Sequence, residues 1–254
     1  MALLTDKVAI ITGASSGIGY ETSKLFAKEG ARVVVGARRE KELNALIDEI
    51  VNGGGKAVAL AGDVKDETYA KSLVELAVKK FGGLDIAFNN AGTLGAMGDT
   101  SEITLEGWLD TLNTNLTSAF LGAKHQIPAM LKKGRGSIIF TSTFVGYTAG
   151  LPGMSAYAAS KAGLVGLTQA LATEFGPKGI RVNALLPGGT DTPMGRSAAN
   201  TPEMLAFVQG LHALKRIATP QEVAQSALFL GSEMSSFVTG SAMLADGGVS
   251  INRT

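Results

Sequence analysis

Residues 8–19 read VAIITGASSGIG, a short apolar run that leads directly into a glycine-rich turn. The run is typical of a buried strand, and beyond the turn Thr22, Leu25 and Phe26 share one stripe of a helix. Glycine allows a tight turn, and the first turn of a helix offers free N–H groups and the positive end of a dipole. The strand–turn–helix order therefore predicts a seat for the pyrophosphate of a dinucleotide.

The glycine spacing is Gly13-x-x-x-Gly17-x-Gly19, which differs from the common G-x-G-x-x-G fingerprint. Tyr20 stands where a phosphate loop of the G-x-x-x-x-G-K type requires lysine, so that class is excluded. An ordinary glycine turn is the alternative interpretation, and the motif alone does not decide between the two.

The alternation of short apolar runs with amphipathic stretches continues along the chain. Strands are expected at residues 8–11, 32–35, 57–60, 84–88, 137–140, 181–186 and 242–244. Most are apolar on both faces, as in parallel strands covered by helices. We expect one α/β domain over residues 1–254, with a doubly wound, mostly parallel, seven-stranded sheet and helices on both faces. Residues 189–214 break the alternation and are expected to form a mobile flap with one or two short helices.

Composition narrows the function classes. Lys and Arg total 23 against 22 Asp and Glu, which predicts no nucleic-acid or anionic-membrane partner. The chain has no Cys and two His residues, so no disulfide framework or metal site is expected. No signal peptide is recognisable, and no apolar run approaches the roughly 20 residues that cross a bilayer. We expect a soluble, cytoplasmic protein.

The end of the second expected strand indicates the type of dinucleotide. An NAD site usually carries Asp or Glu there, but residues 36–39 read GARR. A guanidinium can pair with a 2′-phosphate, so Arg38, with Arg39 beside it, predicts NADP rather than NAD. Alternatively these arginines are solvated charges that open a helix, an interpretation that suits Arg39 better than Arg38.

A candidate proton donor lies far downstream. In a helix, Tyr157 and Lys161 are one turn apart on the same face, and a nearby ammonium or an oxidised nicotinamide ring would lower the tyrosine pKa from about 10. A half-buried tyrosine and a solvated lysine are the alternative. The first interpretation is favoured because strand 137–140 runs into the hydroxyl cluster Thr141-Ser142-Thr143, at the sheet edge where ligands bind in open α/β folds.

Taken together, the chain resembles the short-chain dehydrogenase/reductase family over essentially its whole length. The shared motifs, in order, are 12–19, Asp63-Val64, 89–92 (NNAG), Asn115, the Ser/Thr cluster, Tyr157-x-x-x-Lys161, 181–183 (RVN), Pro187-Gly188 and 246–248 (DGG). The resemblance implies a Rossmann fold, an NADP-dependent carbonyl reductase or alcohol dehydrogenase, and a homotetramer built on helices around residues 114–131 and 154–175.

The resemblance also implies roles for individual residues. Tyr157 would be the general acid and base, Lys161 would hold the nicotinamide ribose, and Asn115 would hold a water that links Lys161 to solvent. For Asn115 a helix cap is the alternative. Implied cofactor contacts are Gly13, Ser15, Ser16, Gly17, Ile18 and Gly19 at the turn, Asp63 and Val64 at the adenine, Asn90, Ala91 and Gly92 near the adenosine ribose, and Pro187, Gly188, Thr190 and Thr192 along the nicotinamide.

One position departs from the family pattern. The substrate-orienting serine of the family falls on Thr143, counted along the strand from Gly136, while Ser142 precedes it. Either hydroxyl can donate to a carbonyl oxygen. The count favours Thr143.

The expected substrate is a small, uncharged, partly apolar ketone or secondary alcohol, because no Arg or Lys is evident among the residues expected to face it. These residues are Leu94, Met97, Phe144, Tyr147, Leu151, Met154 and Met194. Two rival functions remain. An acyl-carrier-protein thioester reductase such as a 3-oxoacyl reductase shares the catalytic motifs, although Pro128 stands where such enzymes tend to carry a basic residue. A non-catalytic dinucleotide sensor is the other, and the intact Asn115, Tyr157 and Lys161 set argues against it.

Overall fold

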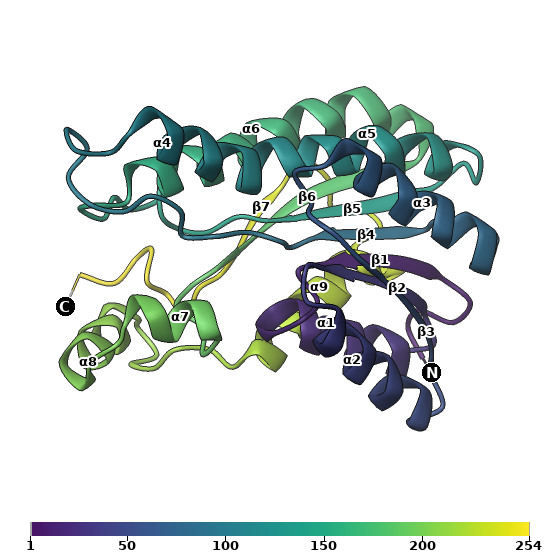
Figure 1. Ribbon diagram of the computed structural model, residues 1–254, viewed down its shortest axis with the longest axis horizontal. Helices are drawn as coiled ribbons and strands as arrows, with labels where there is room; N and C mark the ends of the chain where they lie inside the picture. The colour runs from purple at the N-terminus through teal and green to yellow at the C-terminus, as the bar shows by residue number, and fades with distance from the viewer. Residues whose placement is uncertain (1, 254) are drawn as a thin grey trace.

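The computed structural model of the protein describes residues 2–253 and contains a seven-stranded sheet in the order β3-β2-β1-β4-β5-β6-β7 (Figure 1). The seven strands lie where the sequence predicts them, and every neighbouring pair is parallel, so the sheet is wholly rather than mostly parallel. Their bounds are β1 Val8–Thr12, β2 Arg32–Ala37, β3 Lys56–Ala61, β4 Ile86–Asn89, β5 Gly136–Thr141, β6 Ile180–Pro187 and β7 Ala242–Ala245.

Helices cover both faces of the sheet. In Figure 1, α1 (Gly17–Lys28), α2 (Glu40–Asn52) and α9 (Pro220–Gly231) lie below it, and α3 (Glu67–Phe81), α4 (Leu105–Leu112), α5 (Ser118–Leu131) and α6 (Ser155–Phe175) lie above it. A π-helical turn, Asn113–Thr117, joins α4 to α5, and 3₁₀ turns span Gly176–Lys178 and Glu233–Ser235. Within the described residues, the helices are too short or too polar to cross a bilayer.

The apolar runs form a two-faced core because successive side chains of a strand point to opposite faces. In β1, Val8 and Ile10 join the core under α3, α5 and α6, whereas Ala9 and Ile11 join the core with α1, α2 and α9. All four are at most 1% exposed. If one strand shifted by one residue, its side chains would move to the opposite face of the sheet. Because both faces are buried and apolar, burial alone specifies the register of a strand less strongly than it specifies that the segment is a strand.

The strand order creates a crevice at the sheet's carboxyl edge. The chain leaves β1 into α1 on one face, and after β4 it passes into α4 and α5 on the other. β1 and β4 are neighbours, so the loops after them leave the carboxyl edge towards opposite faces of the sheet. In open α/β sheets such a switch point is where ligands bind.

The flap predicted at residues 189–214 contains two short helices, α7 (Pro193–Ala198) and α8 (Pro202–Leu211). Each starts in the same way: a threonine hydroxyl, of Thr192 or Thr201, accepts a hydrogen bond from the third backbone N–H of the helix, and proline follows it. Proline has no N–H to satisfy at that position, so Thr-Pro is a strong start signal. Both helices lie beside the carboxyl edge of the sheet (Figure 1).

Candidate active site

The glycine-rich turn between β1 and α1 is tied to the loop after β4. Thr12 Oγ1 accepts hydrogen bonds from the backbone N–H groups of Asn90 (3.1 Å) and Ala91 (3.2 Å), and the Asn90 amide donates to the Thr12 carbonyl (3.1 Å). Gly17 has a φ of +58°, and a Cβ on it would lie 2.9 Å from Thr192 Cγ2. The flap therefore reaches over the turn, and only glycine fits there.

The turn fits the pyrophosphate of a dinucleotide. Ser16 precedes α1, its side chain makes no capping hydrogen bond to the helix, and the first turn of α1 carries no acidic residue. The N–H groups of that turn and the helix dipole are thus directed at the crevice without a competing carboxylate. Residues 13–19 would hold the phosphates, as the sequence predicts.

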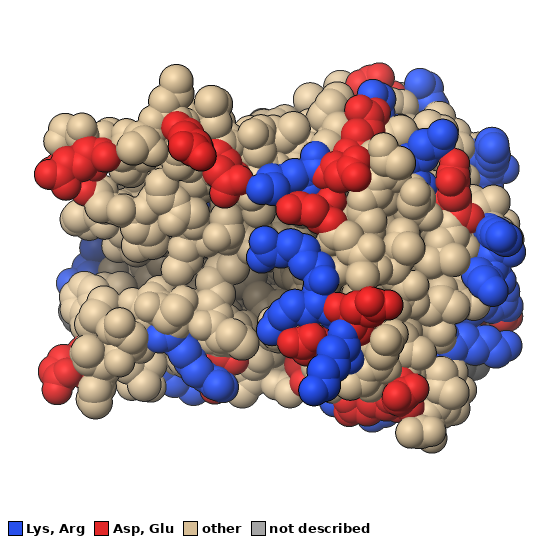
Figure 2. Space-filling view, viewed as in Figure 1, with Lys and Arg blue, Asp and Glu red and all other residues tan. Residues whose placement is uncertain are grey.

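Arg39 lies across this turn. Its Nη2 donates to Ser15 Oγ (2.9 Å) and Ser16 Oγ (3.0 Å), and its Nη1 lies 3.5 Å from a carboxylate oxygen of Glu42. Arg39 is the N-cap residue of α2 and its side chain is 50% exposed, so it is an exposed charge at a helix start that also hydrogen-bonds the glycine-rich turn. Arg38 is exposed just beyond β2. Figure 2 shows Lys and Arg side chains gathered beside a hollow in the middle of this face, which suits an anionic ligand.

Tyr157 and Lys161 lie one turn apart near the start of α6. Lys161 is 4% exposed, its Nζ donates to the carbonyl of Thr141 (2.7 Å), and Nζ lies 5.9 Å from the centroid of the Tyr157 ring. A Cβ on Gly92 would lie 3.1 Å from Lys161 Nζ and 3.1 Å from Asn115 Oδ1. The loop after β4 thus passes directly against the ammonium, which a larger residue would prevent.

Asn115 lies in the π-helical turn between α4 and α5, so it is not a helix cap. Its Oδ1 accepts from the Thr93 N–H (2.8 Å), and its Nδ2 donates to the Thr93 carbonyl and to Ser160 Oγ (both 2.9 Å). The Ser160 hydroxyl in turn donates to the Tyr157 carbonyl (2.7 Å). π-helical turns often mark functional sites. This one brings the Asn115 amide between the loop after β4 and the turn of α6 that carries Tyr157 and Ser160.

The two hydroxyls after β5 point in different directions, as expected for neighbouring residues of an extended chain. Ser142 Oγ donates to the carbonyl of Lys161 (2.7 Å) and is 3% exposed, so its proton is committed to α6. The Thr143 hydroxyl is the side-chain hydrogen-bond partner of Tyr157. Only Thr143 therefore places its hydroxyl beside the phenol.

The electrostatics of the pair are set by burial. Burial raises the pKa of Tyr157 to about 12, and the Thr143 hydrogen bond opposes this with a smaller effect. Lys161 is not among the causes of the Tyr157 pKa shift, since its ammonium is turned to the Thr141 carbonyl. The expected lowering of the tyrosine pKa involves a bound oxidised nicotinamide as well and stays a prediction. Burial also lowers the pKa of Lys161 to about 8. Desolvation disfavours the charged form of both side chains.

An apolar cluster lies beside the phenol. Phe144 and Val145 are buried in it, and Leu151, Met154 and Tyr157 pack against it. The other residues expected to face the substrate are less enclosed. Leu94 is half-buried, and Met97, Tyr147 and Met194 are exposed.

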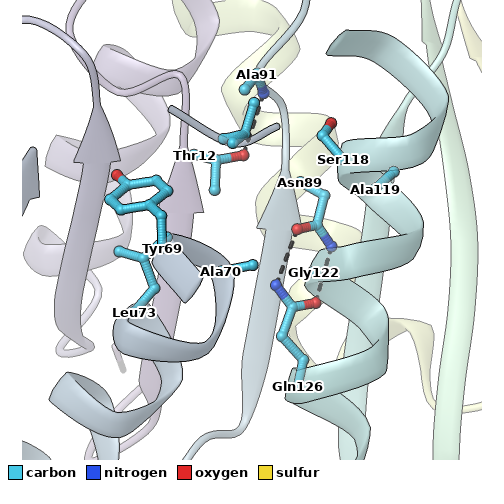
Figure 3. A pocket seen from close by; sticks show the side chains of 11 residues that line it. Thr12, Tyr69, Ala70, Leu73, Asn89, Ala91, Ser118, Ala119, Gly122 and Gln126 are labelled. Atoms are coloured by element: carbon cyan, nitrogen blue, oxygen red, sulfur yellow. Dashed lines mark hydrogen bonds between the residues drawn. The ribbon is translucent and has the colours of Figure 1, made fainter. Parts of the chain in front are cut away.

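The remaining predicted cofactor residues lie along the same edge. Asp63 accepts a hydrogen bond from the Lys65 N–H (3.0 Å), and Thr190 donates to the Gly188 carbonyl (3.0 Å) beyond Pro187 at the end of β6. Val64 lines a cavity of about 20 Å³ between α3 and α5, above a reciprocal amide pair of Asn89 and Gln126 (Figure 3). This cavity is large enough for about one water and not for a nucleotide.

Sequence reasoning missed three residues of the site. Ser160 connects Asn115 to α6, and Val249, from the chain after β7, is buried in the apolar cluster. His212 is 1% exposed; its Nε2 accepts from the Gly189 N–H (2.9 Å) and its Nδ1 contacts the Val208 carbonyl (2.8 Å). The imidazole thus fastens α8 to the loop after β6. No motif or periodic pattern in the sequence predicts these contacts, because the residues that meet do not belong to one repeating pattern.

Comparison with known proteins gives consistent matches. A family model described as enoyl-(acyl carrier protein) reductase matches residues 13–250. Cyclohexanol dehydrogenase of Acinetobacter sp. (strain SE19) is 42% identical over 242 residues, 95% of this chain and 94% of that protein. The 2,5-dichloro-2,5-cyclohexadiene-1,4-diol dehydrogenase of Sphingobium indicum (strain B90A) is 39% identical over 98% of both chains. The crystal structure of levodione reductase superimposes with a TM-score of 0.95 at 31% identity, covering 98% of this chain and 100% of that one.

The fold and these matches define the class: the protein is an NAD(P)-dependent oxidoreductase that acts on CH–OH groups. More narrowly, the chain belongs to the short-chain dehydrogenase/reductase family, which confirms the resemblance seen in its motifs.

We predict that Lys161→Met makes the fold more stable at neutral pH. Because burial lowers the pKa of Lys161 from 10.5 to about 8, the ammonium destabilises the folded state by about 3 kcal/mol below pH 8. The penalty disappears as the pH rises towards 10.5. Loss of the hydrogen bond to Thr141 offsets about 1 kcal/mol. The free energy of unfolding should rise by about 2 kcal/mol at pH 7, measured by urea denaturation.

The gain should shrink between pH 8 and pH 10. Lys132→Met, at an exposed position after α5, is the control and should show no such pH-dependent difference. A Lys161→Met protein less stable than the wild type at pH 7 would contradict the prediction.

Proposed function

We propose that the protein interconverts a compact, uncharged secondary alcohol and its ketone with NADP(H), and that Tyr157 transfers the proton. The observation that carries the proposal is the Tyr157 phenol, which is hydrogen-bonded to Thr143 and packed against an apolar cluster at the edge where a dinucleotide would bind. When bound, the dinucleotide supplies or accepts the hydride.

Each catalytic side chain has a distinct task in this proposal. Tyr157, with a pKa of about 12, is protonated at neutral pH and gives its proton to the carbonyl oxygen during reduction. The Thr143 hydroxyl hydrogen-bonds the same oxygen and stabilises the charge that develops there. Lys161 would hold the nicotinamide ribose hydroxyls, and its positive charge supports the phenolate left behind. The Asn115 amide keeps the loop after β4 in place around that lysine.

An alicyclic substrate is supported by the lining of the site and by the relatives. Phe144, Val145, Leu151 and Met154 carry no charge and form an apolar cluster against which Tyr157 packs. The names of two relatives specify six-membered carbocycles, a cyclohexanol and a dichlorocyclohexadiene diol. We propose a ring of similar size with a secondary hydroxyl or ketone for this protein.

The thioester-reductase alternative is less well supported. The basic residues nearest the end of α5 point elsewhere: Lys133 Nζ lies 2.6 Å and Arg135 Nε 3.8 Å from the buried Asp85 carboxylate. Asp85 directly precedes β4, so these cations lie at the amino edge of the sheet, opposite the catalytic residues. They are poorly placed to guide an acidic carrier protein to Tyr157. A non-catalytic dinucleotide sensor would not require the contacts that Asn115, Thr143 and Tyr157 make, so this alternative is also less well supported.

Self-association is also part of the proposal. Leu105 on α4 is 72% exposed, Phe120 on α5 is 49% exposed, and Phe237 after α9 is fully exposed. Apolar side chains of this size are rarely left in water on a helix face. Further copies of the chain, packed on α4, α5 and α6 in a tetramer, would cover Leu105 and Phe120.

The central test is Tyr157→Phe. Removing the hydroxyl should lower turnover by about 10²–10⁴-fold, the scale of one acid–base group, with dinucleotide affinity unchanged. In the wild type, alcohol oxidation should accelerate as the pH rises from 7 to 10, because only the ionised phenol accepts a proton. Steady-state kinetics with cyclohexanol and cyclohexanone check both. Near-normal turnover of a folded Tyr157→Phe protein would exclude the mechanism.

A second test separates the two hydroxyls after β5. Thr143→Ala should lose about 10²–10³ in rate, as is typical when one donor to a developing oxyanion is removed. Ser142→Ala removes only a hydrogen bond to the Lys161 carbonyl, so its rate per folded enzyme should fall much less. Thr143→Ser should stay active. If the two alanine variants rank the other way in kcat, Ser142 orients the substrate.

A third test concerns the cofactor. Arg38→Ala and Arg39→Ala should each cost roughly 1.5–3 kcal/mol of NADPH affinity, because a guanidinium–phosphate pair is charge-assisted. NADH affinity should barely change. Lys41→Ala, an exposed neighbouring charge, is the control for a general loss of positive potential. Fluorescence titration that shows the wild type preferring NADH would refute the assignment to NADP.

A further inference from the structure

The chain turns sharply after β7. The Asp246 carboxylate accepts hydrogen bonds from the N–H groups of Gly248 (2.9 Å) and Ser250 (3.0 Å), and Gly248 has a φ of +82°. These bonds fold residues 246–252, called here the C-terminal segment, into a compact turn. In Figure 1 this stretch is drawn in yellow and runs towards α7 and α8.

The C-terminal segment is fastened on two sides. On one side, Ser250 Oγ and Thr148 Oγ1 are 2.6 Å apart, which ties it to the loop between β5 and α6. On the other, Asn252 Nδ2 donates to the Gly210 (3.2 Å) and Leu211 (3.1 Å) carbonyls at the end of α8. The Leu214 N–H also donates to the Gly247 carbonyl (3.1 Å). The segment thus bridges the flap and the loop that carries Thr143.

Val249 lies between these two anchors. It is 8% exposed and shares the apolar cluster with Phe144 and Val145, against which Tyr157 and Leu211 also pack. The next apolar residue of the segment, Ile251, is 76% exposed. Val249 is therefore the apolar side chain through which the C-terminal segment reaches the surroundings of the phenol.

We propose that the C-terminal segment forms one wall of the substrate pocket and that Val249 sets the size of the ring accepted there. The inference rests on the proposed alcohol–ketone function. Phe144 and Val249 belong to the same apolar cluster, and Tyr157 packs against that cluster, so a ring bound beside Tyr157 would lie next to both. Each methylene of a substrate or a wall residue changes discrimination by about 10-fold or more in a closed apolar pocket.

The experiment measures kcat/KM for cyclopentanone, cyclohexanone and cyclooctanone with saturating dinucleotide. Val249→Ala should raise the ratio of cyclooctanone to cyclohexanone by about tenfold, and Val249→Leu should lower it, because the first enlarges the pocket and the second narrows it. Ile251→Ala is the matched control from the same segment and should leave every ratio unchanged. Dinucleotide affinity, measured by fluorescence titration, should be the same in all four proteins.

The ratio of kcat/KM for cyclooctanone to that for cyclohexanone distinguishes a role of Val249 in the pocket wall from a purely structural role. If Val249 only stabilised the fold, its variants would lose activity on all three ketones alike, and the wall would be refuted while the function stood. Ile251→Ala shifting the ratio as far as Val249→Ala would refute the assignment to Val249. If the wild type reduced none of the ketones with either dinucleotide, the proposed function would fail, and this inference with it. If circular dichroism shows that Val249→Ala is unfolded, Val249→Leu provides the test. A lower ratio of cyclooctanone to cyclohexanone in that variant supports the wall, and an unchanged ratio refutes it.

Discussion

The buried ammonium of Lys161, beside the sheet, is the constraint around which the site is built. Lys161 is 4% exposed, burial is what lowers its pKa, and its hydrogen bond goes to a neutral carbonyl, that of Thr141. Such a charge is unstable in an apolar interior unless nearby dipoles are fixed towards it. The end of β5 provides one such dipole, the Thr141 carbonyl, and the backbone at Gly92, after the neighbouring strand β4, passes close to the ammonium.

The same edge is locked by hydrogen bonds that join three strand ends. Thr12 after β1 holds the backbone of Asn90 and Ala91, and the Thr141 hydroxyl donates to Asn90 Oδ1 (3.2 Å). Most of these bonds end on backbone atoms, so they fix the course of the loops rather than one rotamer. The tied strand ends therefore keep the glycine-rich turn, the loop after β4 and the end of β5 at a constant separation.

The fold could be predicted from the sequence because burial on both faces leaves a clear trace: short apolar runs separated by amphipathic helices. Bounds were less predictable. The fourth strand was expected to start at Leu84 but begins at Ile86, since Asp85 turns its carboxylate to the Val8 N–H (2.9 Å). Tyr157 and Lys161 could be paired from their spacing together with the hydroxyl cluster that follows the fifth strand. The direction of the Tyr157 pKa shift could not be predicted, because the burial that raises this pKa depends on contacts with segments far away in sequence. The hydrogen bonds of Arg39 to Ser15 and Ser16 could not be predicted either, since no periodic pattern indicates them.

The site has two parts that differ in how they are held. Asn115, Ser142 and Lys161 are bonded to backbone carbonyls and N–H groups of rigid elements. The apolar side beyond Tyr157 is assembled from the loop after β5, the end of α8 and the chain after β7, which touch mainly through side chains. Substitutions on the second side leave the hydrogen bonds of the first in place. Relatives with a common fold and different substrates are compatible with such a division, because function depends on the site rather than on the fold.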